Sequence, residues 1–304
     1  MPAERNQVIA HRSLDRLAGY LAVVLVCALA LLASVSSATG LDRDVAPVRI
    51  AYAAAADTFG DLYLPEGSDG DLPVVVLIHG GGWAQKSNLE YAGAWAKTLT
   101  PYGIAVWNIE YRRVGGQGGW PTTLSDTVTA TNALAGIVQE KASGRLDLSR
   151  VHIAGYSAGG QLAAWVASRS QQGADAPEPN LSVPVRSTTI MAGVFDMTLA
   201  ATAGKDRFVR NLLGGMPTDH PDRYRIASPI EHIPTGLPVT VIHGLGDKVV
   251  SVEQSRRYAR AARAAGDVVD LIELPGVGHG EFGNPTTDAW ATTKQAIIGH
   301  INAS

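Results

Sequence analysis

A five-residue segment, Gly155-Tyr156-Ser157-Ala158-Gly159, limits the folds open to this chain more than any other part of its sequence. It follows an apolar run, Val151–Ala154, and it opens a helical pattern. A serine in this position lies on a sharp strand-to-helix turn, where side chains two positions away on either side would collide with the backbone. The two glycines therefore predict a strand–turn–helix unit that exposes the Ser157 hydroxyl, with a helix N-terminus beneath it that favours negative charge.

The rest of the chain alternates short apolar runs with helical patterns, which is typical of a mostly parallel sheet with helices on both faces. Several runs are apolar at successive positions, as in strands that are covered on both faces. The expected strands are Val48–Tyr52, Asp61–Leu64, Val74–His79, Ala105–Ile109, Val151–Ala154, Ser187–Met191, Val239–His243 and Val268–Leu274. The expected helices are Leu89–Thr100, Leu124–Gln139, Ala158–Ser170, Arg207–Leu213, Val252–Ala265 and Thr286–Ile301. Residues 39–304 are thus predicted to form one α/β domain around an eight-stranded sheet.

One stretch, residues 195–238, departs from this alternation. It holds several prolines among short helical fragments: Pro217, Pro221, Pro229, Pro234 and Pro238. Such an insertion forms either a small cap over the sheet or a long structured connection, and the sequence leaves both readings open.

The first 38 residues have the character of a targeting segment. Arg5, Arg12 and Arg16 precede an uncharged apolar run over residues 17–35, and Ser36-Ser37-Ala38 offers a cleavage point after Ala38. A basic start, an apolar middle and a small-residue exit describe a secretory signal peptide. The run is also close to the ~20 residues that span a bilayer, so an uncleaved signal anchor is the alternative. Both readings place the chain from about residue 39 onward outside the cytoplasm, with membrane contact only through residues 17–35.

Composition narrows the classes of partner and cofactor. A net charge of −3 gives no reason to expect a nucleic-acid partner. The only cysteine, Cys27, lies in the apolar run, so residues 39–304 contain no thiol nucleophile, disulfide or thiolate metal site. The histidines show no spacing typical of a metal site, and no metal or cofactor is expected.

A second glycine-rich motif, His79-Gly80-Gly81-Gly82-Trp83, directly follows an expected strand. Glycines at a strand end offer backbone N–H groups that no side chain obstructs, and such groups can bind an oxyanion, each contributing ~3 kcal/mol of transition-state stabilisation. We expect the oxyanion hole to be formed by the amides of Ala158 and of Gly81 or Gly82. A phosphate-binding loop of the Walker type would require glycine before Lys86, where Gln85 stands instead.

Two further residues complete a catalytic set. Asp247 follows the expected strand Val239–His243, and His279 lies on a glycine-bounded loop after the last expected strand. The chain order Ser157, Asp247, His279 is that of a serine nucleophile, an orienting acid and a general base on an α/β scaffold. Asp196 also follows a strand and is the alternative acid. His243 and His79 are expected to have structural roles.

With these residues identified, the chain resembles the α/β-hydrolase superfamily, and within it the esterase/lipase group that includes hormone-sensitive-lipase-like esterases and arylformamidases. The shared motifs are His79-Gly80-Gly81-Gly82-Trp83, Glu110-Tyr111-Arg112-Arg113, Trp120-Pro121 with Asp126, Gly155-Tyr156-Ser157-Ala158-Gly159-Gly160, Asp247 and His279. The resemblance implies oxyanion donors in the first motif and structural roles for Tyr111, Arg112 and Asp126. The segment Arg113-Val114-Gly115-Gly116 departs from the Leu-Ala-Pro-Glu continuation usual in hormone-sensitive-lipase-like enzymes, which favours an arylformamidase-like or small secreted esterase.

The sequence thus predicts a serine hydrolase that cleaves small-molecule carboxylic esters through an acyl-enzyme. Hydrolysis of amides or formamides and transfer of the acyl group to another acceptor use the same residues and remain alternatives. A non-catalytic binding protein on the same scaffold is the third reading. Trp83, Trp120 and residues 195–238 are expected to line the substrate pocket.

Overall fold

The computed structural model describes residues 46–68, 70–178, 180–203 and 207–304. The predicted signal segment, residues 1–38, and its apolar run, residues 17–35, lie outside the described residues. No helix in the described ranges combines the length and the apolar character that crossing a bilayer requires.

An eight-stranded sheet organises the described part of the chain, with the strand order β1-β2-β4-β3-β5-β6-β7-β8. The first two pairings, β1 with β2 and β2 with β4, are antiparallel, and the others are parallel. The strands are β1 Val48–Ala51, β2 Phe59–Tyr63, β3 Leu72–Ile78, β4 Ala105–Ile109, β5 Leu146–Tyr156, β6 Val185–Met191, β7 Val239–Gly244 and β8 Val269–Leu274. The predicted mostly parallel, eight-stranded sheet is therefore confirmed.

The central strand β3 shows why a continuous apolar run is needed here. Val74, Val76 and Ile78 are buried in one hydrophobic cluster, whereas Val75 and Leu77 are buried in a second cluster on the opposite face. Successive side chains of a strand point to opposite faces, so both faces of β3 are covered.

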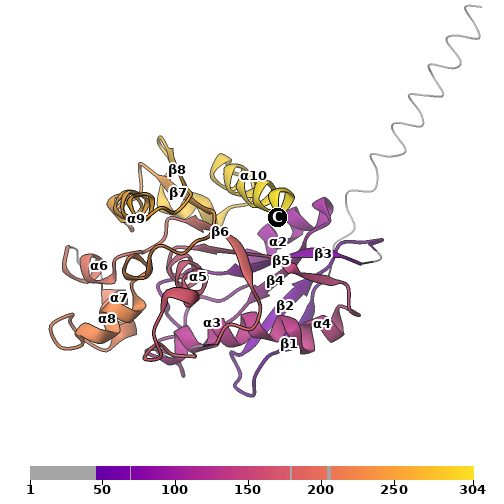
Figure 1. Ribbon diagram of the computed structural model, residues 1–304, viewed down its shortest axis with the longest axis horizontal. Coiled ribbons are helices and arrows are strands. Elements are labelled where there is room, and N and C mark those ends of the chain that lie inside the picture. Colours follow the sequence, from indigo (N-terminus) through magenta and orange to yellow (C-terminus); the bar gives the residue numbers. More distant parts are fainter. Residues whose placement is uncertain (1–45, 69, 179, 204–206) are drawn as a thin grey trace, which may run out of the picture. The chain divides into compact units, whose positions relative to one another are not determined.

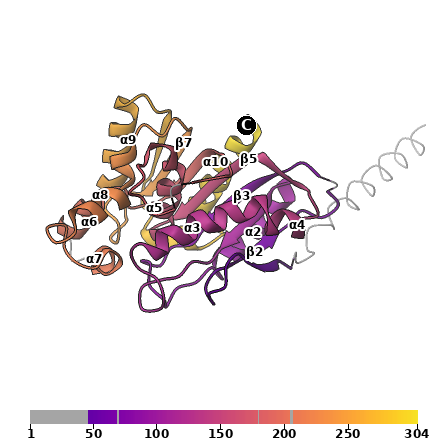
Figure 2. The ribbon, with the colours of Figure 1, turned by 60° about the horizontal axis from the view of Figure 1, so that its bottom comes forward.

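Helices cover both faces of the sheet (Figures 1 and 2). α2 (Ala92–Leu99) and α10 (Asp288–Ala303) contribute Trp95 and Trp290 to the cluster that holds Leu77. The opposite cluster receives side chains from α3, α4, α5 and α9. These helices span Thr122–Asn132, Ile137–Lys141, Ala158–Ala167 and Glu253–Ala264. Short 3-10 turns cover Thr100–Tyr102, Ala133–Ala135, Arg169–Gln171, Pro229–His232 and His279–Gly283.

One predicted helix, Leu124–Gln139, is wrong as a continuous element. α3 ends at Asn132, a 3-10 turn follows, and α4 begins at Ile137. Gly136 between them has φ −125° and ψ −111°, a conformation outside the helical region. Glycine is the residue that a helix interior tolerates least well after proline, and its backbone freedom permits the break.

The described part of residues 195–238 contains the short helices α6 Met197–Ala203, α7 Arg207–Leu213 and α8 Pro221–Ala227, followed by the 3-10 turn Pro229–His232. Of these, only α7 was expected. Val209, Leu213 and Tyr224 are buried in the large cluster on the α5 face, so the segment is anchored on the core. Phe208 differs from the other apolar residues of α7, which are buried, because 41% of its surface stays exposed.

Candidate active site

Ser157 lies between β5 and α5 in a strained backbone conformation, with φ 55° and ψ −117°. A Cβ atom on Gly155 would lie 2.1 Å from the carbonyl oxygen of Gly159, and one on Gly159 would lie 2.2 Å from that of Ile78. No side chain fits at those distances, which is the physical reason for glycine at both positions. A non-glycine residue in such a conformation costs ~1–3 kcal/mol and persists only where its surroundings enforce it.

The structure brings Ser157, His279 and Asp247 together from three separate loops. His279 Nδ1 lies 2.6 Å from Asp247 Oδ2, and His279 Nε2 lies 2.9 Å from Ser157 Oγ. With Nδ1–H donated to the carboxylate, the Nε2 lone pair faces the serine hydroxyl. This is the geometry in which an imidazole can remove the proton of a nucleophile.

The Asp247 side chain is fully buried and accepts several hydrogen bonds. The N–H groups of Val249 and Val250 donate to Oδ1 at 2.8 and 2.9 Å, and His243 Nε2 lies 3.3 Å from Oδ2. Burial raises the pKa of Asp247, but the hydrogen bonds from His243 and His279 outweigh that effect and hold the pKa well below its ordinary value. Asp247 is therefore a carboxylate at neutral pH, and His243 supports it.

The alternative acid, Asp196, has other partners. Its Oδ1 accepts the N–H of Leu199 at the start of α6, and its Oδ2 lies 3.2 Å from Arg257 Nη2. Asp196 thus stabilises a helix start and an ion pair, and the carboxylate beside His279 is that of Asp247.

Tyr156 holds the loop that carries His279. The Tyr156 hydroxyl donates to the carbonyl oxygen of His279 at 2.7 Å, and the two rings lie 5.0 Å apart. Burial raises the pKa of Tyr156, so its hydroxyl stays a donor at neutral pH. Since Tyr156 precedes Ser157 directly, the same turn that presents the serine also holds the histidine loop.

The predicted oxyanion residues lie around the same pocket as Ser157: Gly81, Gly82 and Ala158 are all in its lining. Gly81 and Gly82 have φ 108° and 63°, a region that favours glycine, and a Cβ on Gly81 would lie 2.2 Å from that of Ser87. Within the described residues, the N–H groups of Gly81 and Gly82 have no acceptor. Ala158 is the first residue of α5, and the N–H groups of a first helical turn have no acceptor within the helix.

The BD-FAE family model matches residues 60–261. The chain belongs to the BD-FAE family. Esterase LipC of Mycobacterium tuberculosis is 33% identical over 68% of this chain and 53% of its own length. The acetyl-hydrolase of Streptomyces hygroscopicus is 29% identical over 78% of this chain and 82% of its own length.

A solved structure described as a truncated carbohydrate esterase from gut microbiota superposes with a TM-score of 0.73. It is 22% identical, over 86% of this chain and 99% of that chain. The predicted α/β-hydrolase fold and the predicted esterase group are thereby confirmed. The chain spans about half the length of the curated esterases LipC and LipQ of Mycobacterium tuberculosis that it matches.

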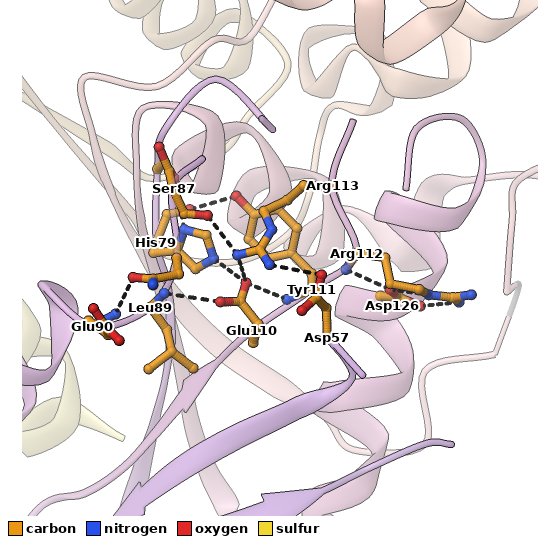
Figure 3. A network of polar contacts seen from close by, with 12 residues as sticks. Asp57, His79, Ser87, Leu89, Glu90, Glu110, Tyr111, Arg112, Arg113 and Asp126 are labelled. Carbon is orange, nitrogen blue, oxygen red and sulfur yellow. Dashed lines mark hydrogen bonds and ion pairs between the residues drawn. The ribbon is translucent and has the colours of Figure 1, made fainter. Parts of the chain in front are cut away.

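In this member of the BD-FAE family, a buried polar network holds the glycine loop to the end of β4 (Figure 3). Glu110 accepts from His79 Nε2 at 2.7 Å and from Arg113 Nη1 at 2.5 Å. It also accepts the N–H groups of Tyr111 and Leu89, and the Tyr111 hydroxyl donates to the carbonyl oxygen of His79. Burial raises the pKa of Glu110, but the hydrogen bond and charge of His79 and the charge of Arg113 outweigh burial and lower it.

A second ion pair in Figure 3 joins Arg112 to Asp126 on α3. Arg112 donates from Nε at 2.9 Å and from Nη2 at 2.6 Å, and its backbone N–H donates to the same carboxylate. Asp126 is buried and this fork-shaped pairing ties the loop after β4 to α3. The contacts are those of a structural pair, as the resemblance implied for these residues.

The pocket beside Ser157 has a volume of about 590 Å³. Trp83 lies in its wall, and its Nε1–H donates to Gln161 Oε1 at 3.1 Å. Trp120 is not brought to this pocket; its N–H donates to the carbonyl oxygen of Leu212 on α7. The described residues contain no cluster of histidine and carboxylate side chains that could hold a metal ion.

Several pocket residues were not predicted from the sequence. Phe208 lies within residues 195–238, which were expected to line the pocket, whereas Tyr91, Val194, Val249, Val250 and Asn284 line it without having been predicted. They come from separate segments, and their local sequence carries no motif. Val249 and Val250 follow Asp247 closely, and this proximity is the one signal that could have singled them out.

Proposed function

We propose that this chain is a serine hydrolase that cleaves carboxylic esters through a covalent acyl-enzyme. The observation that carries the proposal is the position of the His279 ring, which lies 2.6 Å from Asp247 and 2.9 Å from Ser157. The N–H groups of Gly81 and Gly82, which line the same pocket, have no acceptor among the described residues. Relatives named as an esterase and an acetyl-hydrolase support the same class of reaction.

In the first half-reaction, Ser157 Oγ attacks the ester carbonyl carbon while its proton moves to His279 Nε2. The carbonyl oxygen becomes an oxyanion and is met by the backbone N–H groups of Ala158 and of Gly81 or Gly82. When the tetrahedral intermediate collapses, the C–O bond to the alcohol breaks, and the leaving oxygen takes the proton from His279. The products of this step are the free alcohol and acyl-Ser157.

In the second half-reaction, a water molecule replaces the alcohol and gives its proton to His279 Nε2. It attacks the acyl carbon, and collapse of the second intermediate returns the proton to Ser157 Oγ and releases the acid. Asp247 stays ionised throughout, because its hydrogen bonds hold its pKa low, and it stabilises the imidazolium in both halves.

Replacement of the nucleophile tests the proposal. Ser157→Ala is expected to lower the kcat for p-nitrophenyl acetate by ~10⁴-fold or more, since loss of the serine in a triad has cost ~10⁶-fold elsewhere. A fluorophosphonate probe should label the wild-type chain and leave Ser157→Ala unlabelled. Ser170→Ala, at an exposed serine, is the matched control and should behave as wild type.

Retention of a few per cent of activity by Ser157→Ala would reject this assignment. A wild-type chain that is neither active nor labelled would favour a binding protein on the same scaffold. Amide hydrolysis and transfer to a non-water acceptor share the first half-reaction, and product analysis with amide substrates and competing alcohols separates them from ester hydrolysis.

We also propose that residues 1–38 direct the chain out of the cytoplasm, on the basis of their sequence pattern alone. Expression of the full chain in a bacterial host, followed by intact-mass measurement, tests this. Cleavage predicts a released chain that begins at Thr39, and an uncleaved anchor predicts full-length chain in the membrane fraction. Full-length chain in the cytoplasmic fraction would contradict both.

A further inference from the structure

A second cavity, of about 620 Å³, adjoins the pocket that holds Ser157. Four apolar residues line both spaces: Val194, Phe208, Val249 and Val250. The far side of the second cavity is formed by Leu199, Ala200 and Ala203 of α6. The two spaces therefore form neighbouring compartments with a shared apolar boundary, and only the first of them contains the reacting serine.

Four polar side chains line the second cavity, Lys248, Ser251, Glu253 and Gln254, and the last three are engaged in hydrogen bonds or an ion pair, as for Ser251 Oγ, which accepts the N–H of Glu253. Gln254 accepts the N–H groups of Phe195 and Asp196 and donates to the carbonyl oxygen of Asp196. Glu253 pairs with Arg260 at 3.2 Å. The second cavity thus offers mainly aliphatic contact surface, which suits an apolar group rather than a charged or sugar-like one.

Large apolar side chains at the boundary between the two compartments are partly exposed to solvent. Val249 is 66% exposed and Phe208 is 41% exposed, although both are beside buried parts of the core. A bound apolar group that covers them gains roughly 25 cal/mol per Å² of apolar surface removed from water. A contiguous exposed apolar patch at the edge of a cavity is a frequent mark of a binding site.

Phe208 also lies directly against the glycine loop. A Cβ on Gly82 would lie 2.6 Å from Phe208 Cδ1, so the ring contacts the backbone that carries a proposed oxyanion donor. Because Phe208 lines both spaces, a chain that extended from Ser157 past this ring would reach the second cavity. A substrate with a short chain stays within the first pocket.

We infer that the second cavity is a subsite for an alkyl chain attached to the ester that Ser157 attacks, and that Phe208 forms the threshold between the two compartments. The inference rests on the proposed function and specifies its substrate class: esters with a medium-length alkyl chain rather than acetate esters of small alcohols alone. It adds to the site a specificity segment, α6 with Phe208, that takes no part in the chemistry.

Variants on α6 test the subsite. Ala200→Phe places a ring in the second cavity, whereas Thr202→Phe on the same helix is the matched control, because Thr202 is exposed and outside both linings. Two substrate series are compared from two to twelve carbons: p-nitrophenyl esters of linear acids, and acetates of linear alcohols. The first series extends the acyl side and the second extends the alcohol side.

For the wild type, kcat/KM should rise with chain length in one of the two series, because each methylene bound in an apolar pocket adds discrimination of ~10-fold or more. Ala200→Phe should leave the two-carbon substrate within about twofold of wild type and lower kcat/KM for the ten-carbon substrate by ~10-fold or more, by the same reasoning. Thr202→Phe should leave both unchanged. The series that responds identifies the side of the ester that occupies the subsite.

Ala203→Phe is a second test, because Ala203 lines the cavity and is exposed, so the new ring does not have to displace core side chains. The inference is overturned if the two cavity variants and the control give the same chain-length profile in both series. It is also overturned if the cavity variants remain folded and lose the two-carbon and ten-carbon activities equally. In both cases acetate hydrolysis by the wild type would still support the proposed function, whereas absence of all ester hydrolysis and of probe labelling would reject the function itself.

Discussion

At the scale of single residues, the buried carboxylate of Asp247 is held by His243 as well as by His279. His243 is fully buried, with Nε2 3.3 Å from Asp247 Oδ2 and Nδ1 2.6 Å from Ser255 Oγ. Its hydrogen bond is one of the causes of the low pKa of Asp247. His243 therefore acts on the reaction through Asp247, as a positioning residue.

His243→Leu should lower kcat/KM by ~10- to 100-fold, since a buried hydrogen bond to a charged group contributes ~1.5–3 kcal/mol. It should also move the low-pH edge of activity to higher pH, because the Asp247 carboxylate loses a donor and its pKa rises. The measurement is a pH profile of kcat/KM. His152→Leu is the control: His152 is equally buried and bonds to Ser187 and Thr189. A purely structural role for His243 would give both variants the same profile.

The residues of the candidate site were predictable to different degrees. Ser157, Asp247 and His279 each follow a strand, and the carboxyl ends of parallel strands meet at one edge of a sheet, so chain order was sufficient to group them. Phe208 and Val249 reach the same pocket only through the packing of α7 and the loop after β7. Trp120 was also expected to line the pocket, and the fold places it beside Leu212 instead.

At the scale of elements, the junction of β5 and α5 determines how Ser157 is presented. Strand positions were recovered because β3 is apolar at every position and β4 at every position except Asn108, a pattern that follows from burial on both faces. β5 begins at Leu146, earlier than expected, because polar residues such as Asp147 and Ser149 interrupt its apolar pattern. The break between α3 and α4 was missed because helical periodicity continues across Gly136.

Gly159→Ala tests the junction. Its Cβ would lie 2.2 Å from the carbonyl oxygen of Ile78, so β3 and α5 would have to separate. We expect a loss of ~2 kcal/mol or more in the free energy of unfolding, within the range that overpacking causes, together with loss of esterase activity. Gly299→Ala on α10 is the control, because its Cβ would meet nothing within 4 Å. Denaturant unfolding of both variants is the measurement, and equal stability would contradict the steric explanation.

At the scale of the whole described unit, two buried carboxylates give stability a defined dependence on pH. Glu110 and Asp247 both have pKa values held below their ordinary values in the folded state. A lowered folded pKa adds stability that is complete above the unfolded pKa and is lost as the pH falls through the folded one. The contribution of these two carboxylates to stability should therefore be level near neutral pH and decline below the ordinary glutamate value of 4.5.

Glu110→Gln should lower the melting temperature most at pH 7, where it leaves Arg113 without its buried anionic partner. The difference from wild type should shrink as the pH falls from 4.5 toward the lowered pKa of the folded Glu110 carboxyl. Asp222→Asn is the control, since the Asp222 side chain is 85% exposed. Thermal unfolding between pH 3 and pH 7 measures the effect, and a constant difference across that range would contradict it.

The contact between Phe208 and Gly82 bears on which positions around the pocket can change during evolution. Position 82 favours glycine, because its φ of 63° lies in the left-handed region and the Phe208 ring occupies the space that a Cβ would need. Position 208 lies on α7, outside the sheet and outside the group formed by Ser157, Asp247 and His279. New substrate preferences are therefore expected to arise by changes at position 208 and along α6, while the glycine loop stays unaltered. Selection can then vary which substrate is bound without interrupting the reaction.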